Sequence, residues 1–165
     1  MSAIEISNKV IYDASPALGH LMQKKFPVMV SYKLAKIGQL LKTQFELIEQ
    51  VRNSLIEKYG EPGPNNKPII YQYIDKKKNG KTISDGNGNP VKEPNPNFDL
   101  FNDEFKNVLA EKVKLNIEKV RLPENVAATC DKCKHNMDRP LEIEPSILMP
   151  LDLFIEVYEA KTKEK

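Results

Sequence analysis

The sequence predicts an α+β fold in which one long central helix and two shorter helices pack on a small, mostly antiparallel sheet, plus a projecting hairpin. Between Ser31 and Gly60, apolar residues recur at steps of three and four, which is the spacing of one helix face. Short segments that alternate apolar and polar residues lie on both sides of this helix, as expected for half-buried strands. Asn, Gly and Pro concentrate between residues 60 and 96, which is typical of turns and hairpins.

The predicted long helix has one apolar face, formed by Leu34, Ile37, Leu41, Phe45, Ile48, Val51, Leu55 and Tyr59. Ser31 is expected to cap the first turn, because its hydroxyl can accept a hydrogen bond from an unpaired amide. Gly60 is expected to end the helix in a left-handed conformation, and Pro62 prevents continuation. At about 1.5 Å per residue the helix is roughly 40 Å long. Its apolar face therefore needs cover from other elements or from a second copy of the chain, so a homo-oligomer is one hypothesis.

The elements around the long helix follow from local signals. Alternation at Ile4 and Ile6 predicts a first strand, and Ser15–Pro16 predicts the start of a short helix. Alternation between residues 69 and 74 predicts a strand. The turn residues that follow predict that residues 68–92 form a hairpin or tongue projecting from the core.

The last third of the chain predicts one more helix and several short strands. Asn97 is expected to cap a helix with a buried stripe at Phe98, Phe101, Phe105, Val108 and Leu109. A strand is expected from 113 to 117, a short strand at Leu141 and Ile143, a short helix or turn within 147–154, and an edge strand from 155. Residues 123–140 are expected to be an irregular loop that contains both cysteines, and residues 160–165 a frayed, charged tail.

Length and composition predict one domain over residues 1–165. The chain has 25 basic and 23 acidic residues, a net charge of +2, which gives no general attraction to nucleic acid or to an anionic membrane. No apolar run approaches the ~20 residues needed to span a bilayer, and the first residues lack the pattern of a secretion signal. Two closely spaced cysteines suit a reducing compartment. The cytoplasm is the expected location, with no membrane partner.

The hairpin region carries the candidate binding residues Tyr71, Tyr73, Lys76, Lys77, Lys78 and Lys81. A run of lysines beside tyrosines is a hypothesis for a small phosphate-contacting patch. The favoured interpretation is a solubilising hairpin tip, because a lysine run is usually a solvated surface.

The candidate metal ligands are Cys130, Cys133 and His135, which form the sequence C-x-x-C-x-H. Two thiolates at this spacing can reach one tetrahedral zinc ion, and the imidazole can be a third ligand. The fourth ligand would be His20, Asp138 or a group from a second chain. No cofactor is the favoured expectation, with an unliganded loop of reduced thiols; zinc and a dithiol redox pair are the alternatives.

Catalysis has little support in the sequence. No Ser/His/Asp order, H-E-x-x-H motif or Gly-rich phosphate loop is visible. Asp99, Asp103 and Glu104 lie together near a helix start, where acids complement the helix dipole. No catalytic residue is therefore predicted.

Two motifs flank the long helix. The first comprises Lys25, Phe26, Pro27, Val28, Ser31, Tyr32 and Leu34, and the second Arg52, Leu55, Ile56, Lys58, Tyr59 and Gly60. With PSILMPLDLFIEV near the end and the acidic helix NDEFKNVLAEKVKLNIEKV, they resemble a family of short tailed-phage proteins of unknown function. The resemblance implies a phage or prophage source and a host-cytoplasmic setting, and it implies no chemistry. The long hairpin and the CDKCKH segment depart from the family pattern, so an individual function is expected there.

The leading hypothesis is a phage-encoded, non-enzymatic protein that acts by binding another protein, host or viral, as a defence inhibitor or as an accessory protein. The alternative is a nucleic-acid-binding accessory protein that uses the hairpin lysines, with or without a zinc knuckle. An enzyme with an unfamiliar site is the third hypothesis.

Overall fold

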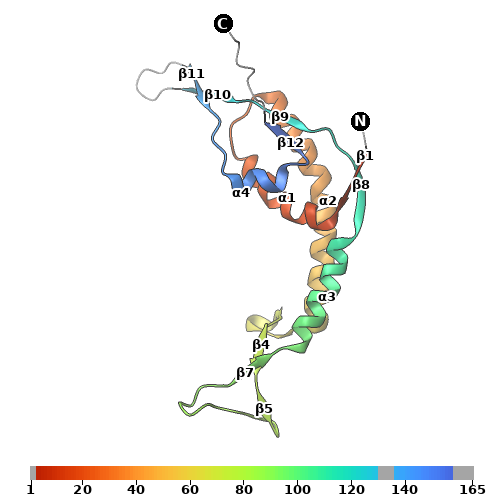
Figure 1. Cartoon of the computed structure of the whole chain (residues 1–165), viewed down its shortest axis with the longest axis vertical. Coiled ribbons are helices and arrows are strands. Elements are labelled where there is room, and N and C mark those ends of the chain that lie inside the picture. The colour runs from red at the N-terminus through yellow and green to blue at the C-terminus, as the bar shows by residue number, and fades with distance from the viewer. Residues whose placement is uncertain (1–2, 130–135, 158–165) are drawn as a thin grey trace. The chain divides into compact units, whose positions relative to one another are not determined.

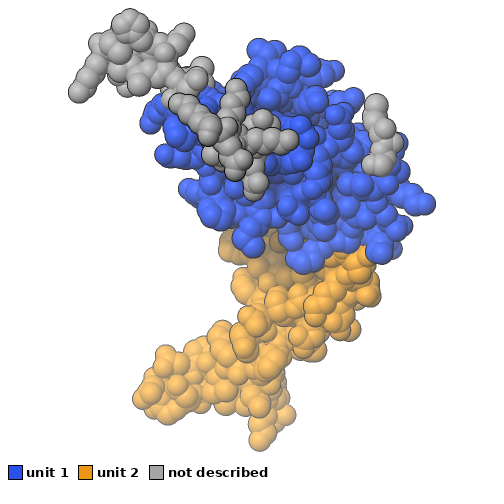
Figure 2. All heavy atoms as spheres, turned by 45° about the horizontal axis from the view of Figure 1, so that its top comes forward, with its two compact units in different colours: residues 1–46, 111–165 blue, residues 47–110 orange. Residues whose placement is uncertain are grey.

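The computed structural model describes residues 3–129 and 136–157 (Figure 1). These residues form α-helices and short strands around one long helix, so the predicted α+β class is confirmed. The chain divides into two compact units (Figure 2): residues 1–46 with 111–165 form unit 1, and residues 47–110 form unit 2. The expectation of one domain stays a prediction.

Unit 1 contains α1 (Asn8–Leu21), α4 (Pro145–Leu148), the short 3₁₀ turn η2 (Met149–Leu151) and the start of α2 (Val28–Tyr59), whose last part belongs to unit 2. Its core is apolar. The most completely buried side chains of this unit are Ile11, Leu18, Leu21, Leu34, Leu41, Val120, Leu122, Leu151 and Phe154. Burial of this kind contributes roughly 1.5–3 kcal/mol per large side chain, so unit 1 is stabilised mainly by apolar packing.

Helix α1 begins at Asn8, and the prediction that it begins at Ser15 is wrong. Ser7 keeps an extended backbone, and the Asn8 amide donates a hydrogen bond to the Glu111 carbonyl oxygen at 2.8 Å. Pro16 therefore lies inside the helix, where a proline costs about 3 kcal/mol. The buried positions at steps of three and four continue across it, at Ile11, Ala14, Leu18 and Leu21. Burial of this face offsets the cost of the proline.

Helix α2 begins at Val28, three residues before the predicted start. The Pro27 carbonyl oxygen accepts hydrogen bonds from the amides of Val30 and Ser31, and the Ser31 hydroxyl donates to the Phe26 carbonyl oxygen at 3.4 Å. Ser31 thus lies inside the first turn, and the prediction that it is the cap is wrong. Proline at the residue before the helix supplies a fixed backbone angle compatible with helix initiation.

Gly60 ends α2 in a different way from the one predicted, because it does not have a positive φ angle. Its amide donates to the Ile56 carbonyl oxygen at 2.7 Å. A Cβ atom at this position would lie 2.4 Å from that same oxygen and 3.0 Å from the Ile69 carbonyl oxygen. Glycine is needed here because two backbone segments approach it closely.

The buried face of α2 is narrower than predicted. Leu34, Ile37, Leu41, Ile48 and Leu55 are buried, whereas Val51 is 41% exposed and Phe45 is half-buried. At 100° per residue, Val51 and Phe45 lie about 60° from the centre of the buried stripe, on opposite edges. The periodicity predicts the centre of this face correctly and overestimates its width.

The strands of unit 1 pair two at a time. Strand β1 (Ala3–Ser7) is antiparallel to β8 (Lys112–Asn116), with Ile6 opposite Val113. Strand β12 (Ile155–Val157) is parallel to β9 (Val120–Leu122). The predicted strands at 4–6, 113–117 and 155–157 are therefore present, with ends that differ by a residue or two.

Residues 123–140 differ from the predicted irregular loop. Strand β10 (Asn125–Thr129) pairs antiparallel with β11 (Asn136–Pro140). The strand predicted at Leu141 and Ile143 is absent, and the Leu141 amide instead donates to the Glu124 carbonyl oxygen at 2.7 Å, next to the last rung of this ladder. The sequences NVAAT and NMDRP lack a clear period-2 alternation, so periodicity alone cannot find this pairing.

Unit 2 contains the end of α2, α3 (Pro96–Ala110) and the short 3₁₀ turn η1 (Pro64–Asn66). Its strands pair antiparallel: β2 (Glu61–Pro62) with β3 (Pro68–Ile69), β4 (Tyr73–Asp75) with β7 (Lys92–Pro94), and β5 (Lys77–Lys78) with β6 (Lys81–Thr82). Its buried apolar side chains are Ile48, Leu55 and Phe101. The single strand predicted from 69 to 74 is interrupted at residues 70–72.

The cap of α3 is Asn95, and the prediction of Asn97 is wrong. The Asn95 side-chain oxygen accepts a hydrogen bond from the Asn97 amide at 3.0 Å, and its carbonyl oxygen accepts from the Phe98 amide. Pro96 then occupies the first helical position, where its missing amide costs nothing. Among the helices of the described residues, none combines the length and apolarity needed to cross a membrane.

Candidate functional site

The hairpin or tongue predicted at residues 68–92 is not a single hairpin. Residues 73–94 of unit 2 form three β arms (Figure 1), and we call these residues the tongue from here on. The first arm is β4–β7, the second is β5–β6, and the third is closed by the bridge between Ser84 and Pro90. They meet at a ring of three backbone hydrogen bonds: Lys76 N–H to Val91 O at 2.8 Å, Val91 N–H to Ile83 O at 2.9 Å, and Ile83 N–H to Lys76 O at 2.9 Å. The ring satisfies the amides at the point where the arms diverge.

The second arm ends in the turn Asn79–Gly80, whose φ angles are 50° and 75°. Two successive positive φ values define a tight hairpin turn that suits the right-handed twist of strands. The turn places Lys78 directly opposite Lys81. Like charges in directly opposite positions destabilise a strand pair.

The third arm is held by Asp85. One of its carboxylate oxygens accepts hydrogen bonds from the amides of Asn87 and Asn89, both at 2.9 Å. The hydrogen bond from the Asn89 amide, followed by that from Asn87, lowers the pKa of the Asp85 carboxyl below its ordinary value. The turn at residues 85–90 is thus stabilised by its own aspartate.

The tongue lysines differ in their ionic partners. Lys76 lies 3.9 Å from Glu93, and Lys92 pairs with Asp75. Lys77, Lys78 and Lys81 are exposed and form no ion pair with any residue that the structure describes. These three side chains form the lysine tip of the tongue.

Tyr71, Tyr73 and Lys77 line a hollow of about 370 Å³ in unit 2. The other charged side chains around it are Glu61, Asp75, Lys92 and Glu93. Tyr71 and Tyr73 are 44% and 53% exposed, so both residues are accessible to a partner. Of the six predicted binding residues, Tyr71, Tyr73 and Lys77 line this hollow. Lys78 and Lys81 lie on the second arm, and Lys76 pairs with Glu93.

Asn95 fixes the base of the tongue. Its side-chain amide donates to the Tyr71 carbonyl oxygen at 2.8 Å, and its backbone amide donates to the Gln72 carbonyl oxygen at 3.0 Å. The residue is only 4% exposed. The same buried side chain therefore caps α3 and holds the strand that enters the tongue.

Glu104 of α3 also has a partner far away in sequence. It accepts hydrogen bonds from Lys58 Nζ at 2.8 Å and from the Tyr59 hydroxyl at 2.6 Å. The Lys58 hydrogen bond, followed by that from Tyr59, lowers the pKa of Glu104, and the same contact with Glu104 raises the pKa of Lys58. Glu104 was predicted to serve the helix dipole. The structure instead makes it a link between α2 and α3.

The predicted metal ligands Cys130, Cys133 and His135 lie outside the described residues, as does the side chain of Asp138. His20 is exposed on α1 and lines a hollow with Asp13 and Glu144. Within residues 3–129 and 136–157, no group of three or more His, Cys, Asp and Glu side chains is close enough to hold a metal ion. The zinc hypothesis stays a prediction.

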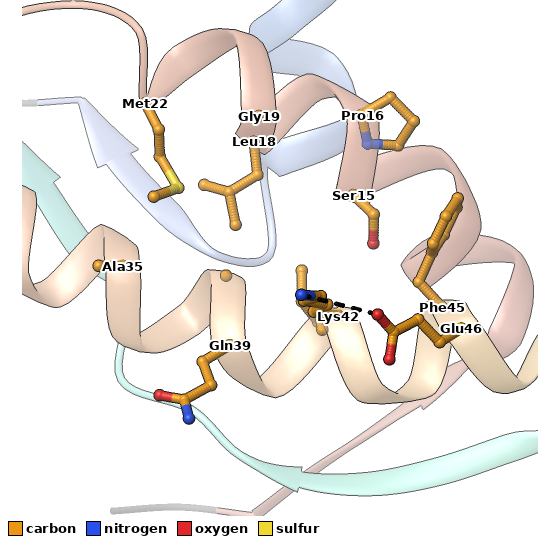
Figure 3. A pocket seen from close by; sticks show the side chains of 12 residues that line it. Ser15, Pro16, Leu18, Gly19, Met22, Ala35, Gln39, Lys42, Phe45 and Glu46 are labelled. Carbon is orange, nitrogen blue, oxygen red and sulfur yellow. Dashed lines mark ion pairs between the residues drawn. The ribbon is translucent and has the colours of Figure 1, made fainter.

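A second hollow lies entirely in unit 1, between α1 and the first part of α2. This α1–α2 groove has a volume of about 760 Å³. Figure 3 shows Ser15, Leu18 and Met22 projecting from α1 towards α2, and Lys42 paired with Glu46 on α2. Met22 Sδ would lie 3.3 Å from a Cβ atom at Gly38, whereas a Cβ at Gly19 would meet nothing within 4 Å. The side chains of Met22 and Leu18 therefore fill the groove beside Gly38, whereas the space beside Gly19 is open.

The groove is not predicted from the sequence, although residues along its two walls recur at helical spacing. Ser15, Gly19 and Met22 recur at steps of four and three, as do Ala35, Gly38 and Lys42 on α2 at steps of three and four. Such spacing places small residues on one helix face. Small residues on a helix face do not by themselves show that a hollow is present, because it forms only when a second helix packs beside them.

No family model, curated protein sequence or solved structure matches this chain. The resemblance to short tailed-phage proteins therefore rests on the sequence motifs given above, around the long helix, in residues 102–120 and near the end of the chain, and it stays a prediction.

Proposed function

We propose that this chain is a phage-encoded, non-enzymatic protein that acts in the host cytoplasm by binding another protein, and that the tongue is its contact surface. The observation that carries the proposal is the lysine tip: Lys78 lies opposite Lys81, beside Lys77, without an ionic partner among the described residues. An acidic group of a partner would relieve the repulsion between the two opposed lysines. The partner surface is therefore expected to carry carboxylates.

The hollow at the tongue favours a protein over a nucleic acid. Tyrosine is enriched at the centres of protein interfaces, because its ring contributes apolar area and its hydroxyl a hydrogen bond. Tyr71 and Tyr73 offer both. The charged side chains around the same hollow are mixed, with Glu61, Asp75 and Glu93 against Lys77 and Lys92, so the hollow lacks the one-sided basic excess of a nucleic-acid site.

The proposal is tested with a tip variant, Lys78→Ser/Lys81→Ser, and a control variant, Lys112→Ser/Lys114→Ser, which removes two exposed lysines of β8. Partners of the intact chain are identified by quantitative mass spectrometry after affinity purification from the phage host. The binding constant is then measured with the purified partner by calorimetry. We expect the tip variant to bind about tenfold or more weakly, because it loses charges at an interface, and the control to bind as the wild type does.

A partner that binds both variants equally would contradict the tongue as the contact surface. A tenfold loss in the control alone would do the same. If no purified protein binds the intact chain, protein binding itself is wrong.

The runner-up is a nucleic-acid-binding accessory protein. It is favoured by the lysine tip together with the exposed tyrosine rings, since stacking on aromatic rings and a basic surface are what single-strand binders use. Fluorescence anisotropy with a labelled 20-nucleotide single strand distinguishes the two. Binding at low salt that falls steeply as salt rises, and that the tip variant loses, would support this alternative.

A further inference from the structure

From the α1–α2 groove of unit 1 we infer a second interaction site, which receives an amphipathic helix of a partner protein with acidic residues on its polar face. The site is independent of the tongue, because every residue of the groove belongs to unit 1. The inference rests on the shape of the groove, on its apolar extension along α2, and on the charge of the segment that forms it.

The shape suits a helix. Both walls are helices, and the space between two neighbouring helices accepts the ridge of a third. Tyr12 of α1 stacks on Phe45 of α2, with ring centroids 5.5 Å apart, and Leu18 and Met22 approach Gly38. These contacts join the helices beneath the groove, while the space beside Gly19 stays open. An absent side chain at that position lets another backbone approach closely.

The apolar surface continues beyond the groove along α2. Val28, Tyr32 and Ala35 recur at steps of four and three, so they lie on one face with the groove wall. Val28 is 82% exposed and Tyr32 is 63% exposed, which makes them among the most exposed large apolar residues of the described chain. From Val28 to Glu46, this apolar extension and the groove wall, which includes the polar Gln39, Lys42 and Glu46, together are about 27 Å long at 1.5 Å per residue. A helix of about 18 residues would cover it.

The positive charge of the chain segment that forms the groove favours a partner with acidic side chains. Residues 14–45, which contain most of the groove and all of its extension, include Lys24, Lys25, Lys33, Lys36 and Lys42 and no Asp or Glu. No other acid-free run in the sequence is half as long. Two of these lysines have ionic partners: Lys42 pairs at 3.7 Å with Glu46, the first acid beyond the run, and Lys33 pairs at 3.5 Å with Glu118. Lys24, Lys25 and Lys36 form no ion pair with a residue that the structure describes, and they carry the positive charge of the segment. The positive potential of such a segment attracts carboxylates and disfavours a second copy of the same surface.

The site is tested with three labelled 18-residue peptides and the full-length chain. The first peptide carries leucine at helical spacing and glutamate elsewhere, the second has lysine in place of glutamate, and the third is a scrambled form of the first. Binding is measured by fluorescence anisotropy. We expect the acidic amphipathic peptide to bind at least tenfold more tightly than either control peptide, and its binding to perturb backbone amide signals of residues 15–46.

The blocking variant is Gly19→Leu, which fills the open space without meeting any atom at its Cβ. Its matched control is Gly86→Leu in unit 2, where a Cβ also meets nothing within 4 Å. We expect at least tenfold weaker peptide binding for Gly19→Leu and no change for Gly86→Leu, with unchanged circular dichroism for both. Lys42→Glu is expected to reverse the preference towards the lysine peptide.

Several results would overturn the inference. They are equal binding of the acidic and basic peptides, amide perturbations outside residues 15–46, and unchanged binding by Gly19→Leu. A dimer in analytical ultracentrifugation that Gly19→Leu dissociates would assign the groove to a second copy. Vesicles of phosphatidylglycerol that compete with the peptide for wild type and not for Gly19→Leu would assign it to a lipid surface.

Discussion

Unit 1 and unit 2 are stabilised by different interactions. The buried apolar side chains of unit 1 come from β1, α1, α2, β9, η2 and β12 and from Ile117 and Phe154 between these elements. Unit 2 buries the apolar side chains of Ile48, Leu55 and Phe101. Hydrogen bonds of three polar side chains, Asn95, Glu104 and Asp85, also stabilise its elements. Apolar burial is indifferent to pH, whereas carboxylate hydrogen bonds are not. A substitution or a change of pH can therefore destabilise one unit and leave the stability of the other unchanged.

The largest expected effect is on the core of unit 1. Phe154→Ala removes a ring that is 0% exposed, and truncation of a buried phenylalanine costs about 3–5 kcal/mol. We expect a loss of that size in the free energy of unfolding, measured by urea denaturation. Hydrogen exchange followed by mass spectrometry should locate the loss of protection in residues 3–46 and 112–157.

Leu153→Ala is the control for this prediction, because Leu153 is the neighbouring residue and is 40% exposed. We expect it to cost well under 1 kcal/mol. An equal loss of protection in both units after Phe154→Ala would show that the units do not unfold separately, and the comparison would fail.

The next effect is on the polar base of the tongue. Asn95→Ala removes the cap of α3, which costs about 1 kcal/mol, and leaves the Tyr71 carbonyl oxygen without its donor, which costs about 1–3 kcal/mol more if it stays buried. We expect faster hydrogen exchange in residues 71–75 and 92–101, with unit 1 unchanged.

Asn97→Ala is the matched control, because Asn97 is exposed and donates only its backbone amide to the cap. Alanine keeps that amide, so the variant should resemble the wild type. If Asn97→Ala is the more harmful substitution, the sequence-based assignment of the cap is right and the geometry described above is wrong.

The smallest effect is the pH dependence of unit 2. The folded pKa of Glu104 is below its ordinary value of 4.5, so its contribution to stability is fully present above that pH and is lost as the pH falls through the folded pKa. The lowered pKa of Asp85 acts in the same direction. Lys58 has a raised pKa, so its contribution is lost only when the pH rises above 10.5 and through the folded value.

This prediction is measured as the rate of amide exchange in unit 2 between pH 3 and pH 6, corrected for intrinsic exchange. We expect protection to fall below about pH 4.5 in the wild type and to depend less on pH in Glu104→Gln, whose side chain does not titrate in this range. Carbon-detected NMR titration of the Glu104 carboxyl gives its pKa directly. A value at or above 4.5 would contradict the contacts with Lys58 and Tyr59.

Residue spacing alone is enough to predict the class of the fold and the centre of the long helix. Leu34, Ile37, Leu41, Ile48 and Leu55 are buried as predicted, because helical periodicity is a property of spacing alone. The turn at Asn79–Gly80 was also predictable, since few residue pairs adopt two positive φ angles. The sequence also identifies the candidate binding residues Tyr71, Tyr73, Lys76, Lys77, Lys78 and Lys81, while their function stays a proposal.

Features that depend on residues far away in the sequence cannot be predicted from local patterns. Pro16 lies inside α1 because the buried face continues past it, and Gly60 is required because the Ile69 carbonyl oxygen approaches it. Asn95 is the cap because its side chain also reaches Tyr71, and the groove forms where α1 and α2 both contribute small residues to its lining, Ser15 and Gly19 from α1 and Ala35 and Gly38 from α2. Local propensity favours the three incorrect helix-start and cap assignments, at Ser15, Ser31 and Asn97. Propensities of this kind are worth about 1 kcal/mol, and burial and long-range hydrogen bonds outweigh them.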